Sequence, residues 1–346
     1  MTSPASSHPT KGLMNPATRT GSILARRLTS TPEFLPFTLV VVLVVVFASL
    51  TPNFLSRGNI SNLLAFTPEL GMIALGMTIL MTSGEFDLSV GSVFGFTPVL
   101  MWTLFNEGVA TLEVAMLAAM LVAVAIGFVN GWFVTRLKIP SFLVTLGMMM
   151  TIRGTALYTT SGFPQRTWRA ESWLMDLVAG SFYIGEFRVY ASIFWFLGFA
   201  LVLGYLLTQS KIGNWIQASG GNPVSARARG VRVGLTKTWL FILTASMAAY
   251  AGITSSIRVA AANPNSGTGY ELEVIAMVVI GGTALGGGRG TILGTVLGVF
   301  MLRMMRNGIV LIGVPGLAYN IFIGVTILTM MALQSYLARR HPAGSG

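Results

Sequence analysis

The stretch from residue 63 to residue 105 decides the fold: LLAFTPELGMIALGMTILMT (63–82), SGEFD (83–87) and LSVGSVFGFTPVLMWTLF (88–105). Two predominantly apolar runs, each close to the roughly 20 residues that a helix needs to cross a bilayer, flank a short polar segment. That segment holds two carboxylates, Glu85 and Asp87, in a chain with only 11 acidic residues. Ionisable groups near hydrocarbon are costly, so such residues usually face a pathway or end a helix at the interface.

The composition extends this pattern to the whole chain. Of its 346 residues, 53% are hydrophobic and 10% are charged, and the mean hydropathy is +0.73. A soluble domain carries about 25% charged residues. The apolar runs are continuous rather than alternating, and a bilayer offers backbone groups no water, so the spans are helices. The sequence therefore predicts an all-α polytopic membrane protein.

Several kinds of chemistry are excluded by residues that the chain lacks. It has no cysteine, and its two histidines, His8 and His341, lie in the polar tails. This excludes thiolate and HExxH metal sites and a histidine-based triad, and we expect no metal site and no catalytic residue. No lysine follows a glycine, so the chain has no P-loop, and we expect it to bind no cofactor of its own.

The net charge of +11 has two interpretations. A basic patch can attract nucleic acid, but a membrane protein also carries an excess of Lys and Arg in its cytoplasmic segments. The basic residues fall in the predicted inner segments, so we expect the lipid bilayer as a partner and no nucleic acid.

The apolar runs predict about ten transmembrane helices within a domain of residues 35–337, between a mobile N-terminal tail (1–34) and a C-terminal tail (338–346). An even number of spans puts both termini on one side. Fourteen Lys and Arg residues on that side against five on the other identify it as the cytoplasm. The predicted spans are 35–51, 63–82, 88–105, 112–134, 141–160, 190–208, 238–257, 272–287, 290–309 and 317–337.

Three further arginines, Arg153, Arg303 and Arg306, lie towards the outer ends of predicted helices. For Arg303 we expect a side chain that reaches out to the outer interface, and the alternative is a role in the pathway. The fourteen basic residues on the predicted cytoplasmic side are Lys11, Arg19, Arg26, Arg27, Arg136, Lys138, Lys211, Arg227, Arg229, Arg232, Lys237, Arg289, Arg339 and Arg340. The five on the predicted outer side are Arg57, Arg166, Arg169, Arg188 and Arg258.

Two connections are longer than simple turns. The outer segment 161–189 carries a group of aromatic residues (Trp168, Trp173, Phe182, Tyr183 and Phe187), which predict a surface-lying helix or a docking face for an external partner. The inner segment 209–237 holds five basic residues and no acidic one. Within it, Pro223 to Arg229 predicts a short helix that ends at Gly230, because proline favours a helix start and glycine its end.

Glycines recur at every fourth position from residue 282 to residue 298. This spacing places them on one helix face and lets helix backbones approach closely, although the cluster 286–290 must interrupt the face with a turn. The pattern fits neither a phosphate-binding P-loop nor a dinucleotide fingerprint. We therefore expect helix packing from Gly282, Gly286, Gly290, Gly294 and Gly298.

The order of the motifs resembles the permease subunits of ribose-type importers of the ATP-binding-cassette class. The resemblance covers about residues 50 to 335 and rests on GMIALGMT (71–78), SGEFDLSVGS (83–92), KIPSF (138–142) and the segment from Gly281 to Thr295. Glu85-Phe86-Asp87 stands where that family carries an aliphatic or glycine-rich acidic motif. The segment GGN (220–222), with residues 226–230, resembles the family's coupling segment.

The resemblance implies a permease in the bacterial inner membrane that imports a monosaccharide or related polyol, driven by ATP hydrolysis on other subunits. The implied partners are a second copy of the chain, a periplasmic sugar-binding protein, and two ATP-binding subunits or one fused pair, which hold ATP and Mg²⁺. The resemblance names no particular sugar. The residues implied in coupling to the ATPase are Gly221, Asn222, Ala226, Arg227, Arg229 and Gly230; the alternative is a basic loop that only sets the topology.

Five polar residues are candidates for the translocation path or a gate: Glu85, Asp87, Asn130, Asn263 and Asn265. Each has an alternative interpretation. Asp87 is also placed to cap the helix that follows it, and Asn263 and Asn265 also fit a solvated loop. Glu85 and Asp87 would otherwise serve as a proton relay in a self-sufficient secondary transporter.

Overall fold

The computed structural model describes residues 33–166, 172–319, 321–326, 328–329 and 332. Nearly all of both predicted tails, together with Trp168 and Arg169, lies outside these residues. The helices are α2 (Phe34–Leu50), α3 (Arg57–Thr82), α4 (Val90–Asn106), α5 (Leu112–Arg136), α6 (Ser141–Thr160), α7 (Trp173–Ala179), α8 (Ala191–Gln209), α9 (Lys211–Gly221), α10 (Pro223–Ala228), α11 (Val233–Val259), α12 (Tyr270–Ile280) and α13 (Ile292–Leu311), with short 3₁₀ turns at Pro52–Leu55 and Gly316–Ala318.

Three of the long helices, α3, α5 and α13, begin where a short polar side chain satisfies a free backbone donor. Ser56 Oγ accepts from the backbone N–H three residues on at the start of α3, and Thr291 Oγ1 does the same for α13. Within the residues that the structure describes, five helices are long and apolar enough to cross a membrane: α3, α5, α8, α11 and α13. The described chain is thus an all-α membrane protein, as its composition predicts.

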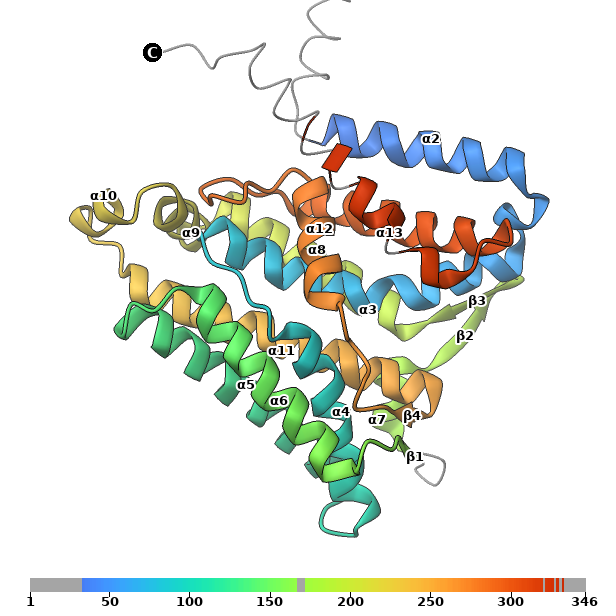
Figure 1. Cartoon of the computed structure of the whole chain (residues 1–346), viewed down its shortest axis with the longest axis horizontal. Coiled ribbons are helices and arrows are strands. Elements are labelled where there is room, and N and C mark those ends of the chain that lie inside the picture. Colours follow the sequence, from blue (N-terminus) through green and yellow to red (C-terminus); the bar gives the residue numbers. More distant parts are fainter. Residues whose placement is uncertain (1–32, 167–171, 320, 327, 330–331, 333–346) are drawn as a thin grey trace, which may run out of the picture.

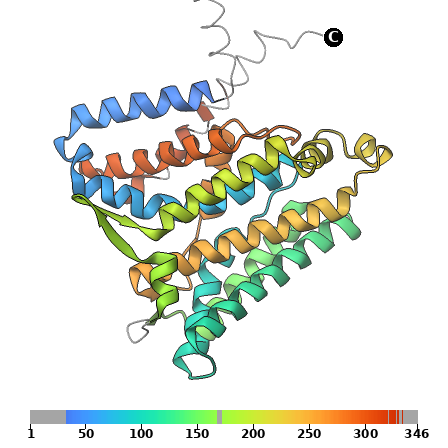
Figure 2. The same ribbon diagram turned by 180° about the vertical axis from the view of Figure 1, so that it is seen from behind.

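The bundle has two distinct ends, which Figures 1 and 2 show from opposite sides. One end carries α9, α10, residues 137–140 and the connection 281–291, and is called here the α10 end. The opposite end, called the hairpin end, carries α7 and two small antiparallel sheets. These are the hairpin of β2 (Ser181–Ile184) with β3 (Phe187–Tyr190) and the pair of β1 (Gln165–Arg166) with β4 (Ala261–Ala262).

Helix α3 forms the centre of the molecule. Its residues from Thr67 to Thr82 are all buried, and it packs against α8, α11, α12 and α13. Helices α2, α5 and α8 instead expose apolar side chains outwards, such as Leu121 (59%) and Leu201 (76%). In a bilayer these outward faces meet lipid, so α3 is enclosed by protein while the outer helices are enclosed by membrane.

Two details differ from the sequence prediction. The predicted span 272–287 ends earlier, at Ile280, because Gly282 takes φ +95°, a left-handed conformation that stops a helix. The segment 161–189 forms the short helix α7 but also a hairpin, whose turn uses Gly185 at φ +59°. Aromatic residues suit both a surface helix and a strand, so composition alone did not separate the two.

Helices α4 and α12 begin inside the bundle. Each is preceded by a non-helical segment, 83–89 before α4 and 263–269 before α12, and both segments run into the middle of the bundle (Figure 1). The segment 263–269 meets the first turn of α4 through glycine: a Cβ on Gly91 would lie 2.3 Å from Gly267 O. Non-helical backbone at membrane depth is tolerated only where protein or a water-filled cavity surrounds it, so this junction is a candidate part of a pathway.

Candidate functional site

A cavity of about 470 Å³ lies between α3, α4, α11, α12 and α13. Helix α3 starts at Arg57 and lines the cavity as far as Glu69, about 18 Å along its axis, so the cavity extends from the hairpin end towards the middle of the bundle. It is lined by Asn62, Leu63, Phe66, Thr67, Glu69, Phe94, Ser255, Arg258, Val259, Ser266, Tyr270, Arg303, Arg306, Asn307 and Val310.

A buried ion pair forms one wall of the cavity. Arg258 Nε donates to Glu69 Oε1 at 2.9 Å, and Arg258 Nη2 contacts the same oxygen. The two side chains are only 7% and 4% exposed. The guanidinium group also lies over the Phe66 ring, 3.9 Å from its centroid. Burial of both charges is tolerated because each is paired, and the aromatic face adds a cation–π contact.

Two further arginines line the cavity from α13. Arg303 is 7% exposed, and its Nη2 donates to Phe66 O at 2.7 Å. The expectation that Arg303 reaches out to the interface is therefore wrong: a carbonyl on α3 holds it inside the bundle. Arg306 lies 4.0 Å from Glu273, whose other oxygen accepts from the Tyr319 hydroxyl at 2.7 Å. These contacts fix guanidinium groups around a space that can hold a small polar solute.

Asp87 and Asn130, 43 residues apart, meet in the non-helical segment before α4. Asp87 Oδ1 accepts from the backbone N–H and the hydroxyl of Ser89, at 2.7 Å and 2.6 Å. Asn130 Nδ2 donates to Asp87 Oδ2 at 3.3 Å and to Ser89 Oγ at 3.0 Å. The capping interpretation of Asp87 needs correction, since the N-cap of α4 is Ser89. Asp87 instead satisfies the donors of the buried irregular backbone that leads to the helix.

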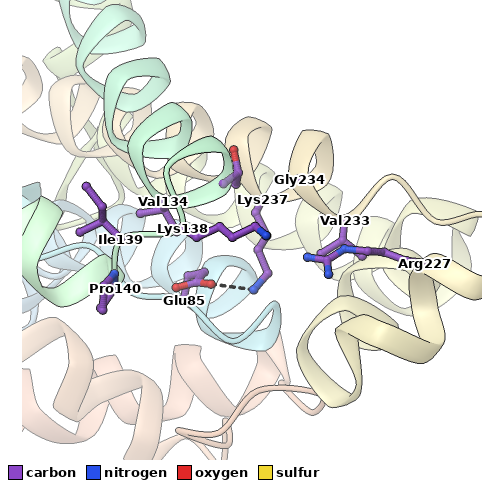
Figure 3. A pocket seen from close by; sticks show the side chains of 10 residues that line it. Glu85, Val134, Lys138, Ile139, Pro140, Arg227, Val233, Gly234 and Lys237 are labelled. Atoms are coloured by element: carbon purple, nitrogen blue, oxygen red, sulfur yellow. Dashed lines mark hydrogen bonds and ion pairs between the residues drawn. The ribbon is translucent and has the colours of Figure 1, made fainter.

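Glu85, two residues earlier, points towards the α10 end. Its Oε1 accepts from Lys237 Nζ at 2.6 Å, and both side chains are less than one-fifth exposed. Figure 3 shows the pair within a pocket of about 260 Å³ that Lys138 and Arg227 also line. Glu85 is therefore an ion-pair partner that ties segment 83–89 to α11.

The remaining path candidates lie elsewhere. Asn263 Oδ1 accepts from the Asn265 backbone N–H at 2.9 Å, which makes a local turn at the hairpin end. Neither asparagine lines the cavity, although the neighbouring Ser266 does. The structure thus brings Asp87 and Asn130 together, links Glu85 to α11, and leaves Asn263 and Asn265 in a turn.

The inner segment folds into two helices, α9 and α10, joined at Asn222. The predicted short helix is confirmed: α10 covers Pro223–Ala228, and Gly230 follows at φ +85°. Asn222 Oδ1 accepts from the backbone N–H of Val224 at 3.1 Å and of Ser225 at 3.0 Å. Asn222 is thus the N-cap of α10, while Arg227 and Arg229 are exposed at the far end of the bundle.

The end of helix α9 packs against the transmembrane helices through backbone atoms rather than side chains. A Cβ on Gly220 would lie 2.0 Å from Thr82 O and 2.6 Å from Gly288 N, and Gly288 N donates to that same carbonyl at 2.8 Å. A Cβ on Gly287 would lie 2.7 Å from Gly84 Cα. We call Gly84, Gly220, Gly287 and Gly288 the glycine junction. It joins the end of α3, the end of α9 and the connection between α12 and α13.

The predicted glycine face is only partly a helix face. Gly294 and Gly298 lie on α13 against the backbone of α12, where a Cβ would come within 1.9 Å and 2.1 Å of carbonyl oxygens. Gly290 sits outside the helix against Thr82. A Cβ on Gly286 would meet nothing within 4 Å, so the prediction that Gly286 belongs to a helix-packing face was wrong. The turn at 286–290 breaks the spacing, as consecutive glycines weaken a helix.

Glu69, Glu273 and Arg258 were missed as site residues at the sequence level. A signal was present, because Glu69 is a lone carboxylate inside an otherwise apolar span. Its partner lies 189 positions away, and that pairing could not be read from spacing.

Several apolar helices, two helices that begin inside the bundle and a cavity lined by charged residues define a multi-pass membrane transport protein of the permease class. Residues 59–331 match the family described as "Branched-chain amino acid transport system / permease component", and the chain belongs to this family. It is therefore a multi-pass inner-membrane permease subunit of an ATP-binding-cassette importer, a transport subunit rather than an enzyme.

The curated relatives point in the same direction. The chain is 36% identical over 295 residues to the ribose import permease protein RbsC of Escherichia coli K12, covering 85% of this chain and 91% of the relative. It is 33% identical over 299 residues to RbsC of Bacillus subtilis, covering 86% and 91%. It is 32% identical over 301 residues to the autoinducer 2 import system permease protein LsrC of Salmonella typhi, covering 86% and 84%. No solved structure matches the chain.

Proposed function

We propose that the chain conducts a monosaccharide or related polyol into the cytoplasm through the cavity between α3, α4, α11, α12 and α13. The cavity carries the proposal: it sets guanidinium, carboxylate and amide groups beside the aromatic rings of Phe66, Phe94 and Tyr270. Hydroxyl-rich solutes are held by such convergent polar groups against apolar walls. The import of ribose by the relatives in Escherichia coli and Bacillus subtilis supports the same class of cargo.

The orientation belongs to the same proposal. Ten spans, with both termini in the cytoplasm, put the α10 end inside the cell and the hairpin end in the periplasm, in line with the excess of basic residues at the α10 end. A periplasmic sugar-binding protein would deliver cargo to the hairpin end. A second copy of the chain would complete the path, with the domain of residues 35–337 forming each half.

ATP hydrolysis would act on the cavity through α9 and α10. Two ATP-binding subunits or one fused pair, holding ATP and Mg²⁺, would engage Asn222, Arg227 and Arg229, with the end of α9 at Gly221 and the turn at Gly230. Ala226 is 3% exposed and would support α10 from beneath instead of contacting the partner. The glycine junction offers a stiff link from there to α3 and to the connection before α13. Such a link matters because nucleotide can drive transport only if its states favour different arrangements of the helices.

Uptake measurements test this proposal directly. Cells that carry the complete importer are given labelled monosaccharides and polyols, with and without ATP depletion or a proton ionophore. We expect one substrate whose uptake disappears on ATP depletion and persists with the ionophore, in the wild type and in Glu85→Gln. Uptake that follows the proton gradient and is lost in Glu85→Gln or Asp87→Asn would identify a proton-coupled secondary transporter instead.

Filling the cavity is expected to block transport without breaking its ion pairs. Ser255 lines the cavity and is half-buried, so Ser255→Trp would place an indole in the proposed path. We expect the maximal uptake rate to fall at least about tenfold, while Ser255→Ala stays near the wild type. Purified complexes with equal amounts of all subunits would show that assembly is intact. Normal uptake through Ser255→Trp would place the path elsewhere.

The N-cap of α10 provides a test of coupling. Asn222→Ala removes the acceptor for two backbone donors, which costs a helix about 0.5–2 kcal/mol, while Asn222→Ser keeps a capping oxygen. We expect Asn222→Ala to lower the sugar imported per ATP hydrolysed several-fold, and Asn222→Ser to restore most of it. Uptake and ATPase activity in the same proteoliposomes measure this ratio. Equal ratios in both variants would argue against α10 as the coupling element.

A further inference from the structure

The α10 end carries a basic groove that the transport path does not use. The groove has a volume of about 940 Å³ and lies between the end of α5, helix α10 and the start of α11. Arg136, Lys138, Arg227 and Arg232 line it, together with aromatic and apolar residues, and no carboxylate does. All four basic residues are exposed. Within the described residues, none of the four has a carboxylate within ion-pair distance.

The adjoining pocket of Figure 3 shares Lys138 and Arg227 with this groove. Their side chains point into it beside Lys237 and Glu85, whose ion pair already occupies the one carboxylate. The two spaces together thus set five cationic groups against one anion. Lys138 also takes φ +57°, a left-handed conformation that is uncommon for a residue other than glycine. The turn thus holds Lys138 beside the other cations of the groove and the pocket.

The other part of the groove is aromatic. Phe128 and Trp132 line it from α5, and they are 50% and 42% exposed. Phe128 lies eight residues before Arg136, about 12 Å deeper along an apolar membrane helix. The groove is therefore basic at the end of the bundle and aromatic towards the membrane interior. Anionic lipids have the same order, with a phosphate at the surface and acyl chains below it.

We propose that this groove binds an anionic phospholipid of the cytoplasmic leaflet. The phosphate would lie among Arg136, Lys138, Arg227 and Arg232, and an acyl chain would run along Trp132 and Phe128. Basic pockets between membrane helices on the cytoplasmic side suit such headgroups. A free phosphate shares the headgroup chemistry but leaves the aromatic part uncovered. An acidic segment of a soluble subunit would have to enter the bilayer to reach Phe128.

Native mass spectrometry of the purified full-length chain, titrated with phosphatidylglycerol or phosphatidylcholine, tests the proposal. We expect the wild type to retain phosphatidylglycerol preferentially. Arg136→Gln with Arg232→Gln should weaken retention about 25-fold, because each basic residue near an anionic lipid contributes roughly a factor of five. The control pair is Arg57→Gln with Arg188→Gln, which removes two exposed arginines at the hairpin end and should bind as the wild type does.

Further arms separate the sources of phosphate. Trp132→Ala should weaken retention of the lipid while leaving the charges intact, and excess inorganic phosphate should not displace the lipid. Equal retention of both lipids, or complete displacement by phosphate, would overturn the proposal. Undiminished lipid retention in the double variant, together with lost capture of the ATP-binding subunit, would make the groove a protein-docking surface instead. Thermal melting of each variant shows whether weaker retention comes from a folded protein. None of these readouts depends on which solute is transported.

Discussion

Arg258→Met is expected to destabilise the protein by about 3–5 kcal/mol and to abolish uptake, because it leaves the Glu69 carboxylate buried without a partner. Glu69 is 4% exposed in its side chain, and among the ion pairs of the described residues its pair with Arg258 is the most deeply buried. Methionine keeps much of the apolar stem volume, so the loss comes from charge rather than from a cavity. Thermal unfolding of purified protein in detergent measures the change.

Two comparisons isolate the buried charge as the cause. Glu69→Gln combined with Arg258→Met removes both charges and should recover a large part of the lost stability. Arg57→Gln at the hairpin end breaks an ion pair with Glu186 whose side chains are 67% and 64% exposed, and should cost less than about 1 kcal/mol. A loss of similar size in Arg57→Gln and Arg258→Met would contradict a special role for the buried pair.

Gly220→Ala is expected to have the second-largest effect, about 3 kcal/mol or more, together with loss of ATP-driven uptake. Its Cβ would lie 2.0 Å from Thr82 O and 2.6 Å from Gly288 N. Both neighbours are backbone, so neither can rotate away, and the glycine junction must open. Helix propensity alone predicts the opposite sign, since alanine favours a helix over glycine.

The adjacent Gly221 gives a matched control for stability. An added Cβ there would meet only Gly288 Cα, at 3.8 Å, an ordinary van der Waals contact. Gly221→Ala should therefore melt within about 0.5 kcal/mol of the wild type. If Gly220→Ala melts as Gly221→Ala does, the backbone contact is not as close as the structure indicates.

Local residue patterns predicted much of the coupling segment. Pro223 and Gly230 marked the start and end of α10 because each residue restricts or extends its own backbone conformation. Proline has a fixed φ that suits the first turn of a helix, and glycine adopts the left-handed φ that ends one. The segment 281–291 was predicted to contain a turn for the same reason. The hairpin was not predicted, since its strands are specified by each other across a turn rather than by local composition.

The candidate site was predicted less completely. Glu85, Asp87 and Asn130 were singled out as scarce polar groups, but their partners were not foreseen. Lys237 is 152 positions from Glu85, and Asn130 is 43 from Asp87. The cavity itself, with Glu69 and Arg258 in its wall, exists only where five helices meet. Arg303 was misplaced because its position near a helix end is compatible with both an outward and an inward side chain.

The sequence by itself determined the helical membrane fold, the ordered motifs of a permease and the absence of a P-loop. These follow from composition and from local backbone preferences, which depend on residues no farther apart in sequence than the length of one transmembrane helix. Only the tertiary structure decided which charges are buried together, where α4 and α12 start, and how glycines from three segments form one junction. Each of these depends on groups tens to hundreds of residues apart, and their cost or benefit exists only once packing has excluded lipid and water from between them.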